Sequence, residues 1–154
     1  MSSKLLAYKS KRNLKKSGEP IAIIKKEKIG NKRIIFVIHN HYASHHHYDL
    51  RLEMSGVLKS WAVPKEPPRA KGIKRLAIQV EDHPLSYAKF QGEIKEGYGK
   101  GIVKIWDKGT YELIDKTSKK LIIKLNGKKL KGEYVLVKTK YGNKPEKSWL
   151  WFKV

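Results

Sequence analysis

Short apolar runs alternate with turn residues along the chain from residue 34 to the end. The runs are rich in Val, Ile, Leu and aromatic residues and are bounded by Gly, Pro and Asn, which is typical of β-strands. We expect strands at residues 34–39, 47–54, 57–63, 75–80, 101–106, 110–114, 121–125, 133–138 and 149–154. Ser55-Gly56, Lys108-Gly109 and Asn126-Gly127 have the composition of hairpin or tight turns. Many short strands with little helix predict a mainly β fold, either a barrel or a sandwich.

A single domain is expected to span residues 1–154, a length that suits one buried core. Residues 1–33 carry eleven Lys and Arg against two acids, and we interpret them as a basic arm lying on a β-body of residues 34–154. The Pro-rich segment 64–72 is interpreted as a loop rather than a domain boundary. Trp61, Trp106, Trp149 and Trp151 are expected in the core rather than on a base-stacking surface.

Positive charge dominates the composition, with 35 Lys and Arg against 14 Asp and Glu and a formal net charge of +21. Such a surface attracts polyanions, and nucleic acid is the partner it favours, because neutralised phosphates release counterions. A Lys-rich solvated surface in a heat-adapted organism is the alternative interpretation. An anionic membrane fits less well, since the sequence has no basic amphipathic helix.

The sequence has no Cys, no membrane span and no signal peptide, and these absences exclude several kinds of site and predict where the protein acts. Its lack of Cys excludes disulfides, thiolate metal sites and a Cys nucleophile. No run approaches the ~18 apolar residues of a membrane span, and the N-terminal residues have no signal-peptide pattern. We therefore expect a cytoplasmic, nucleoid-associated protein with no membrane partner.

The stretch 36–53, FVIHNHYASHHHYDLRLE, carries the strongest chemical signal. Strand side chains alternate between faces, so His47, Asp49 and Arg51 share one face, opposite an apolar one. Two imidazoles and a carboxylate are a common ligand set for Mn²⁺, Fe²⁺ or Zn²⁺. His41 completes the set if its strand pairs antiparallel with the next, and Arg51 would then grip a phosphate beside the metal.

The stretch 74–94 offers a second group of polar side chains. Pro84 excludes helical geometry at His83, which places that histidine at a strand-to-turn junction. If a helical turn begins at Pro84, Tyr87 lies near His83, and Arg75 starts the strand that leads there. A histidine in this place could act as an acid or a phosphate ligand, and a tyrosine could donate a hydrogen bond to phosphate.

Several alternatives stay open on the residues alone. Five of the six histidines fall between His39 and His47, and such a run is also found as a loose metal-binding tract or by chance. His39, His45 and His46 are interpreted as non-ligands. An Fe(II) oxygenase could use His47, Asp49 and His83 as a facial triad. A non-catalytic nucleic-acid-binding barrel with incidental histidines is the other rival.

Residues 36–53 closely resemble the 3′-phosphoesterase module of bacterial DNA ligase D and its stand-alone archaeal relatives. The shared pattern is His41, Ala43 and then the run His47-Tyr48-Asp49-Leu50-Arg51-Leu52-Glu53. The resemblance continues through residues 56–65, Arg75-Leu76-Ala77, residues 80–85, Tyr87-Ala88, Gly97-Tyr98-Gly99 and Trp106-Asp107-x-Gly109.

This resemblance implies a closed or nearly closed β-barrel with short surface helices and a manganese-dependent enzyme, with Co²⁺ and Zn²⁺ as alternative metals. It implies removal of a 3′-terminal ribonucleoside and then of the 3′-phosphate, which leaves a 3′-hydroxyl during strand-break repair by non-homologous end joining. The implied substrates are primer-template or broken duplex ends. The chain shows no polymerase or ligase module, so we expect handover to a separate DNA ligase and polymerase.

Site residues are implied position by position. His41, His47 and Asp49 look like the metal ligands, and Arg51, Arg75, His83 and Tyr87 look like the catalytic set. Substrate-binding roles are implied for Arg12, Asn13, Glu19 and Lys65. The family usually has Asp where this chain has Asn13, often Gln at His39 and commonly Leu at His46. The resemblance implies that a carboxylate at position 13 aids the second step, so Asn13→Asp is predicted to raise 3′-phosphate release more than ribonucleoside removal.

Overall fold

Nine strands and two short 3₁₀ helices make up the described part of the computed structural model, which comprises Leu5, Ala7, Tyr8 and residues 34–154. The order is β1 (Ile34–Tyr42), β2 (His47–Met54), β3 (Val57–Val63), β4 (Lys74–Pro84), η2 (Leu85–Lys89), β5 (Gly92–Ile94), β6 (Gly101–Lys116), β7 (Lys120–Asn126), β8 (Lys131–Lys138), η3 (Pro145–Lys147) and β9 (Ser148–Lys153). Within the described residues, no helix is long and apolar enough to cross a membrane. The predicted basic arm lies outside the described residues except at Leu5, Ala7 and Tyr8.

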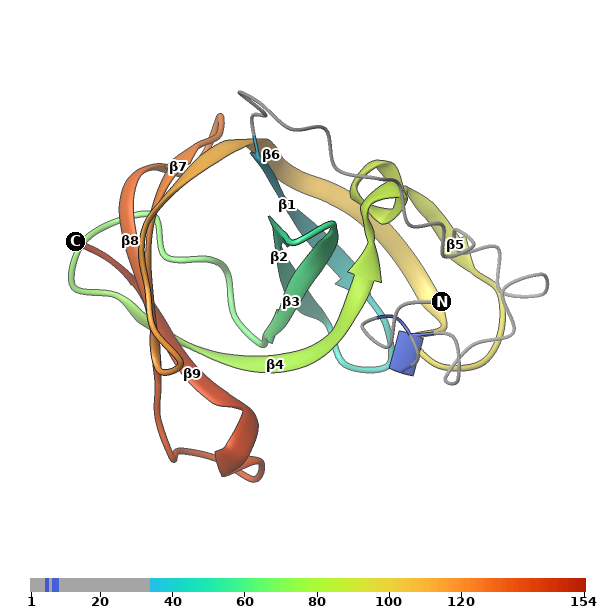
Figure 1. The fold of residues 1–154 in the computed structure, drawn as a ribbon. Helices are drawn as coiled ribbons and strands as arrows, with labels where there is room; N and C mark the ends of the chain where they lie inside the picture. Colours follow the sequence, from blue (N-terminus) through green and yellow to red (C-terminus); the bar gives the residue numbers. More distant parts are fainter. Residues whose placement is uncertain (1–4, 6, 9–33) are drawn as a thin grey trace.

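The strands form a closed barrel, as Figure 1 shows. The sheet order is β1-β2-β3-β4-β9-β8-β7-β6, and β6 pairs back onto β1, so eight strands close on themselves. All of these pairings are antiparallel, and the short β5 is added to the first residues of β6 outside the ring. The barrel and the short surface helices are therefore confirmed, and the sandwich alternative is wrong.

The Lys108-Gly109 turn predicted from the sequence is wrong. β6 runs through this position as one strand of 16 residues, which replaces the two strands predicted at 101–106 and 110–114. Gly109 pairs with Phe36 of β1, and a Cβ there would meet the backbone carbonyl of Asn126. A glycine inside a strand can mark close approach of another backbone rather than a turn. The short strand β5 has no counterpart in the sequence prediction.

Asp107 and Gly127 hold the connection between β7 and β8 against β6. The carboxylate of Asp107 accepts backbone N–H groups from Lys128 and Leu130, each at 2.9 Å. A Cβ on Gly127 would collide with that carboxylate and with the ring of Phe36. The Trp106-Asp107-x-Gly109 motif therefore fixes the connection between β7 and β8, which is a structural role.

Alternation along β2 separates the barrel core from the polar outer face. Leu50 and Leu52 point into the core with the rings of Trp61 and Trp151, whereas the intervening side chains face outward. Trp149 is also buried, so the core prediction is confirmed for Trp61, Trp149 and Trp151, whereas Trp106 is only partly buried against the same core.

A second, smaller apolar cluster lies on the outer side of β1 and β3. It consists of Tyr8, Val37, Leu58, Tyr87 and Ala88. Two of these residues come from η2, the helical turn expected after Pro84, which covers this face in Figure 1. The cluster gives the outward polar side chains of β1 and β2 a packed support, which an exposed barrel surface would lack.

Candidate active site

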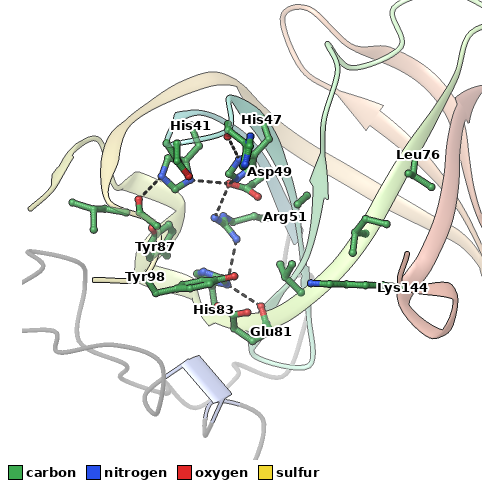
Figure 2. A pocket seen from close by; sticks show the side chains of 18 of the residues that line it. His41, His47, Asp49, Arg51, Leu76, Glu81, His83, Tyr87, Tyr98 and Lys144 are labelled. Atoms are coloured by element: carbon green, nitrogen blue, oxygen red, sulfur yellow. Dashed lines mark hydrogen bonds and ion pairs between the residues drawn. The ribbon is translucent and has the colours of Figure 1, made fainter. Parts of the chain in front are cut away.

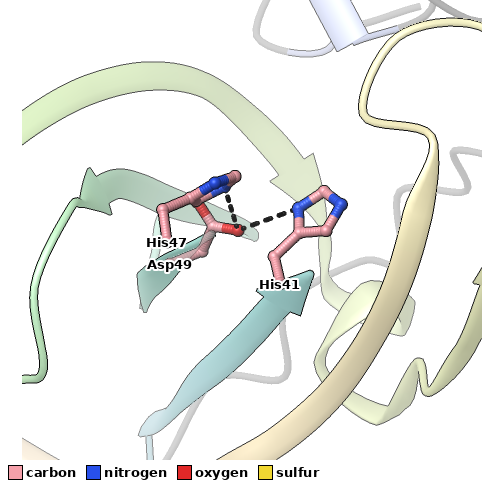
Figure 3. A group of neighbouring side chains, drawn as sticks. All are labelled: His41, His47 and Asp49. Carbon is pink, nitrogen blue, oxygen red and sulfur yellow. Dashed lines mark ion pairs between the residues drawn. The ribbon is translucent and has the colours of Figure 1, made fainter. Parts of the chain in front are cut away.

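His41, His47 and Asp49 converge at the end of β1 and the start of β2 (Figure 3). His41 and His47 are cross-strand partners in the register of the two antiparallel strands, as the sequence predicted. Asp49 lies two residues along the same face, with its Oδ2 3.2 Å from His47 Nε2 and 3.6 Å from His41 Nδ1. One ligand atom from each residue lies within 4.8 Å of the other two, so the three could share one ion.

In each of the two imidazoles, the nitrogen that faces away from Asp49 donates to a backbone carbonyl, which favours a cation between the other nitrogens and Asp49. Nε2 of His41 donates to the carbonyl oxygen of Gly99 at 2.6 Å, and Nδ1 of His47 donates to that of His45 at 2.9 Å. In the neutral rings the other nitrogens therefore carry lone pairs that face the Asp49 carboxylate. Three acceptors that converge in this way require a cation or added protons between them, and an outer carbonyl is the usual partner of a metal-binding histidine.

Charge around Asp49 keeps it ionised although it is buried. Burial alone would raise its pKa, but the Arg51 guanidinium and the hydrogen bonds with His41 and His47 outweigh burial and hold the pKa well below its usual value. Burial lowers the pKa of His47, but the hydrogen bond to Asp49 and the negative charge of Asp49 outweigh burial, so the pKa is raised above 6.5. In the absence of metal, the two side chains thus tend to form an ion pair.

Arg51 is held from several sides and is almost fully buried. Its Nη1 donates to Ser60 Oγ at 2.9 Å and lies 3.2 Å from His83 Nδ1. Nη2 lies 3.5 Å from Asp49 Oδ2, and the guanidinium carbon is 4.8 Å from the centre of the Tyr87 ring. The fixed guanidinium lies directly beside the metal ligands, which suits the binding of a phosphate oxygen that also contacts a metal.

His83 lies at the end of β4, beside the helical turn that carries Tyr87. The centres of the two rings are 4.7 Å apart, as expected from the sequence, and the Tyr8 ring packs edge-on at 5.0 Å. His83 Nδ1 is 2.9 Å from the Glu81 carbonyl oxygen, which can only accept, so we place a hydrogen on Nδ1. Because His41 rather than His83 completes the ligand cluster, the geometry disfavours the oxygenase triad of His47, Asp49 and His83.

These side chains line one cavity of about 760 Å³ (Figure 2). The cavity brings together six of the predicted site residues: His41, His47, Asp49, Arg51, His83 and Tyr87. It also has an apolar wall from β3 and β4 and a border from the loop that precedes η3.

The structure does not bring Arg75 and Lys65 to this cavity. Arg75 lies on the opposite face of β4 from the lining residue Leu76, and its Nε donates to the Glu66 carbonyl oxygen at 2.7 Å. Lys65 is exposed in the loop after β3 and is not among the lining residues. The predicted substrate-binding residues Arg12, Asn13 and Glu19 lie outside the described residues.

Sequence reasoning missed several neighbours of the site. His39, interpreted as a non-ligand, is indeed outside the three-residue cluster, but its Nδ1 accepts from Arg51 Nε at 3.1 Å. Its position on the same strand face as His41 was the available signal. Ser60, Gly99 and Lys144 lie far from the histidine run in sequence, and strand periodicity alone could not bring them to it. His46 is exposed, stacked on Tyr42 at 4.7 Å.

Comparison with known proteins gives one consistent answer. Residues 39–138 match the family described as the DNA ligase D 3′-phosphoesterase domain. The chain is 42% identical over 144 residues, or 90% of its length, to the multifunctional non-homologous end joining DNA repair protein LigD of Mycobacterium tuberculosis. It is 42% identical over 160 residues, or 99% of its length, to the LigD of Pseudomonas aeruginosa. The matched region is 19% of each of these proteins, so the chain spans about a fifth of their length.

Proposed function

The chain belongs to the 3′-phosphoesterase domain family of DNA ligase D, and from this premise we propose that it is a metal-dependent phosphoesterase that heals the 3′ ends of nucleic-acid strands in non-homologous end joining. The observation that carries the proposal is the convergence of His41, His47 and Asp49 beside the buried Arg51, in one cavity with His83. The net charge of +21 supports a nucleic-acid substrate.

The proposed reaction has two hydrolytic steps. In the first, water attacks the phosphorus of the last diester, the bond to the 5′-oxygen of the terminal ribonucleoside breaks, and the strand keeps a 3′-phosphate. In the second, water attacks that phosphate, the bond to the 3′-oxygen of the strand breaks, and inorganic phosphate leaves a 3′-hydroxyl. Each leaving oxygen must gain a proton as its bond to phosphorus breaks.

The residues of the cavity have separate roles in this proposal. When bound, a divalent metal offsets negative charge on the phosphate and makes water a better nucleophile. Arg51 binds a non-bridging oxygen through the guanidinium that Ser60 and His39 hold in place as hydrogen-bond acceptors. His83 delivers a proton from Nε2 to the leaving oxygen when its ring is in the imidazolium form, and the hydrogen on Nδ1 stays directed to the Glu81 carbonyl. The proton that the attacking water loses restores the imidazolium. Tyr87 supports both, with its ring against His83 and below Arg51.

Mn²⁺ is the metal we propose, with Co²⁺ and Zn²⁺ as alternatives, because two imidazoles and one carboxylate accept all three ions. We also propose that a DNA ligase and a polymerase use the resulting 3′-hydroxyl. The proposal is supported by the relatives, which are multifunctional end-joining proteins.

The experiment is incubation with a labelled primer-template that ends in one ribonucleotide, with and without Mn²⁺, followed by product sizing. We expect a 3′-phosphate strand to form first and a 3′-hydroxyl strand to follow, both only with metal. His47→Ala should abolish both steps. His46→Ala is the matched control because that histidine is exposed and outside the ligand cluster. Salt-sensitive binding without any cleavage would instead support the non-catalytic barrel.

A further inference from the structure

The cavity extends well beyond the groups that could hold a metal and a phosphate. On the side toward the centre of β4 it is lined by Leu76, Ile78 and Val80, which share one face of the strand. Ala62 of β3 extends this surface, because it is the cross-strand partner of Ile78. We call these four residues the β4 wall. The catalytic residues assigned above do not use it.

The β4 wall is partly open and bounded at one end. Leu76, Ile78 and Val80 are each partly exposed, so a ligand could contact them without a change in the fold. The loop with Gly142 closes the end near Leu76, since a Cβ on Gly142 would lie 3.7 Å from the Leu76 side chain. In Figure 2, Tyr87 and Tyr98 lie on one side of Arg51, and Leu76 and Lys144 lie on the other.

We propose that the β4 wall binds the nucleobase of the terminal ribonucleotide by apolar contact, and that base identity is not read there. This rests on the proposed function, because it requires the scissile phosphate to lie at the metal ligands and Arg51. A base is the apolar, flat part of a strand end, whereas a phosphate gains nothing from aliphatic side chains. The four wall side chains offer no hydrogen-bonding group, so they cannot distinguish base edges.

The size of the cavity indicates one terminal nucleotide rather than a longer stretch of strand. A volume of about 760 Å³ is within the range of about 300–1,000 Å³ that encloses a single small ligand. A duplex is far too wide for this space, so the base-paired part of the substrate must remain outside. The nucleoside that leaves in the first step is therefore the part that lies on the wall.

The test compares two strand ends in two variants of the full chain. The double substitution Ile78→Thr and Val80→Thr makes the wall polar while keeping β-branched residues suited to a strand. The control is Ile114→Thr, an exposed residue on β6 that does not line the cavity. Three kinds of strand end are compared. The first ends in a ribonucleoside that carries one of the four normal bases, the second ends in an abasic ribose, and the third ends in a 3′-phosphate.

We expect the double variant to lose roughly five- to tenfold in kcat/KM for the base-bearing ends. Its rates on the abasic ribose and on the 3′-phosphate should match those of the Ile114→Thr control. The wild-type protein should remove all four bases at rates within about threefold of one another, since the wall reads no base edge. Equal loss on base-bearing and abasic ends, or no loss at all, would overturn the base subsite.

A binding measurement keeps the subsite separate from the proposed function. If the wild-type protein releases nothing from any strand, the proposed function fails. The subsite is then judged with a strand ending in 2-aminopurine riboside, whose fluorescence reports the surroundings of the base. The double variant should bind this end roughly five- to tenfold more weakly than the control does. An unchanged Kd overturns the subsite whatever the catalytic result.

Discussion

Arg51 donates a hydrogen bond from Nε to Nδ1 of His39, with 3.1 Å between the two nitrogens. The other ring nitrogen, Nε2, donates to the Phe90 carbonyl oxygen at 3.1 Å. This second bond fixes the hydrogen on Nε2 and leaves Nδ1 as the acceptor that Arg51 needs. Burial, with the nearby charge of Arg51, lowers the pKa of His39 to about 3, so the ring stays neutral beside the guanidinium.

His39→Gln should retain most activity, whereas His39→Leu should lower kcat/KM for 3′-phosphate release by about 10- to 100-fold. A Gln side chain can accept from Arg51, but a Leu side chain leaves Nε buried without its acceptor. Steady-state kinetics with a 3′-phosphate strand and Mn²⁺ titration by calorimetry would measure the two effects. Metal affinity should hardly change in either variant, because His39 is outside the ligand cluster. Equal kinetics for the two variants would refute this positioning role.

Replacement of Asp49 should affect stability as well as metal binding. Asp49→Asn and Asp49→Ala are both expected to lose Mn²⁺ binding and turnover, because each removes the anionic ligand. Asp49→Ala should also destabilise the fold by about 3–5 kcal/mol, since it leaves the buried Arg51 without its carboxylate. Urea denaturation would measure this loss, and Asp49→Asn should show less of it. Normal manganese-dependent activity in either variant would refute the ligand assignment.

Local pattern was sufficient to predict some parts of this structure. The observed bounds of β2 and β3 equal the predicted ones, because clean alternation and the Ser55-Gly56 turn, with φ of 51° and 81°, mark both strands. The same alternation placed His47, Asp49 and Arg51 on one face. These elements depend on neighbours in the sequence, which a single sequence displays.

Contacts between distant segments were not predictable in this way. Gly109 has the local pattern of a turn, but the approach of the Asn126 backbone explains why a glycine lies within β6. The family resemblance implies a catalytic role for Arg75, but alternation along β4 directs this side chain away from the cavity. The sequence of the β4 wall has only the pattern of an ordinary half-buried strand. Its place in a cavity depends on the closed barrel and on loops that are distant in sequence.

Proton competition should make metal binding depend on pH. Without a metal, the pKa of His47 lies above its usual value of 6.5. The ion pair of His47 with Asp49 therefore stabilises the fold fully below pH 6.5, and this stabilisation is lost as the pH rises through the raised pKa. A metal needs the neutral ring, so its contribution has the opposite sign. The rise in Tm caused by Mn²⁺ should therefore increase from about pH 6 to about pH 8. A pH-independent rise in Tm would contradict this.

Lys144 is expected to contact a phosphate of the strand, because its side chain is directed toward the cavity in Figure 2. Lys144→Ala should raise KM by about three- to tenfold, leave kcat unchanged and reduce the slope of log affinity against log salt by about one. Lys140→Ala is the control, since Lys140 is an exposed residue of the same loop that does not line the cavity. Equal salt slopes for the two variants would refute the contact.

Gly99 holds His41 in place, and its substitution should weaken metal binding without removing any ligand. Nε2 of His41 donates to the Gly99 carbonyl oxygen at 2.6 Å, and a Cβ on Gly99 would lie 3.3 Å from Cε1 of the same ring. Gly99→Ala should therefore shift the loop or the imidazole. We expect a loss of about 10- to 100-fold in Mn²⁺ affinity, the usual effect of disturbing a partner that orients a ligand.

Gly97→Ala is the matched control for this substitution. Gly97 has φ of 82° and Gly99 has φ of 81°, so an alanine is equally strained at either position. A Cβ on Gly97 meets nothing within 4 Å, whereas one on Gly99 meets the metal-ligand ring. Both variants should lose a similar amount of stability in urea denaturation, but only Gly99→Ala should lose metal affinity. Equal Mn²⁺ affinities would mean that backbone strain, rather than contact with His41, accounts for the glycine at position 99.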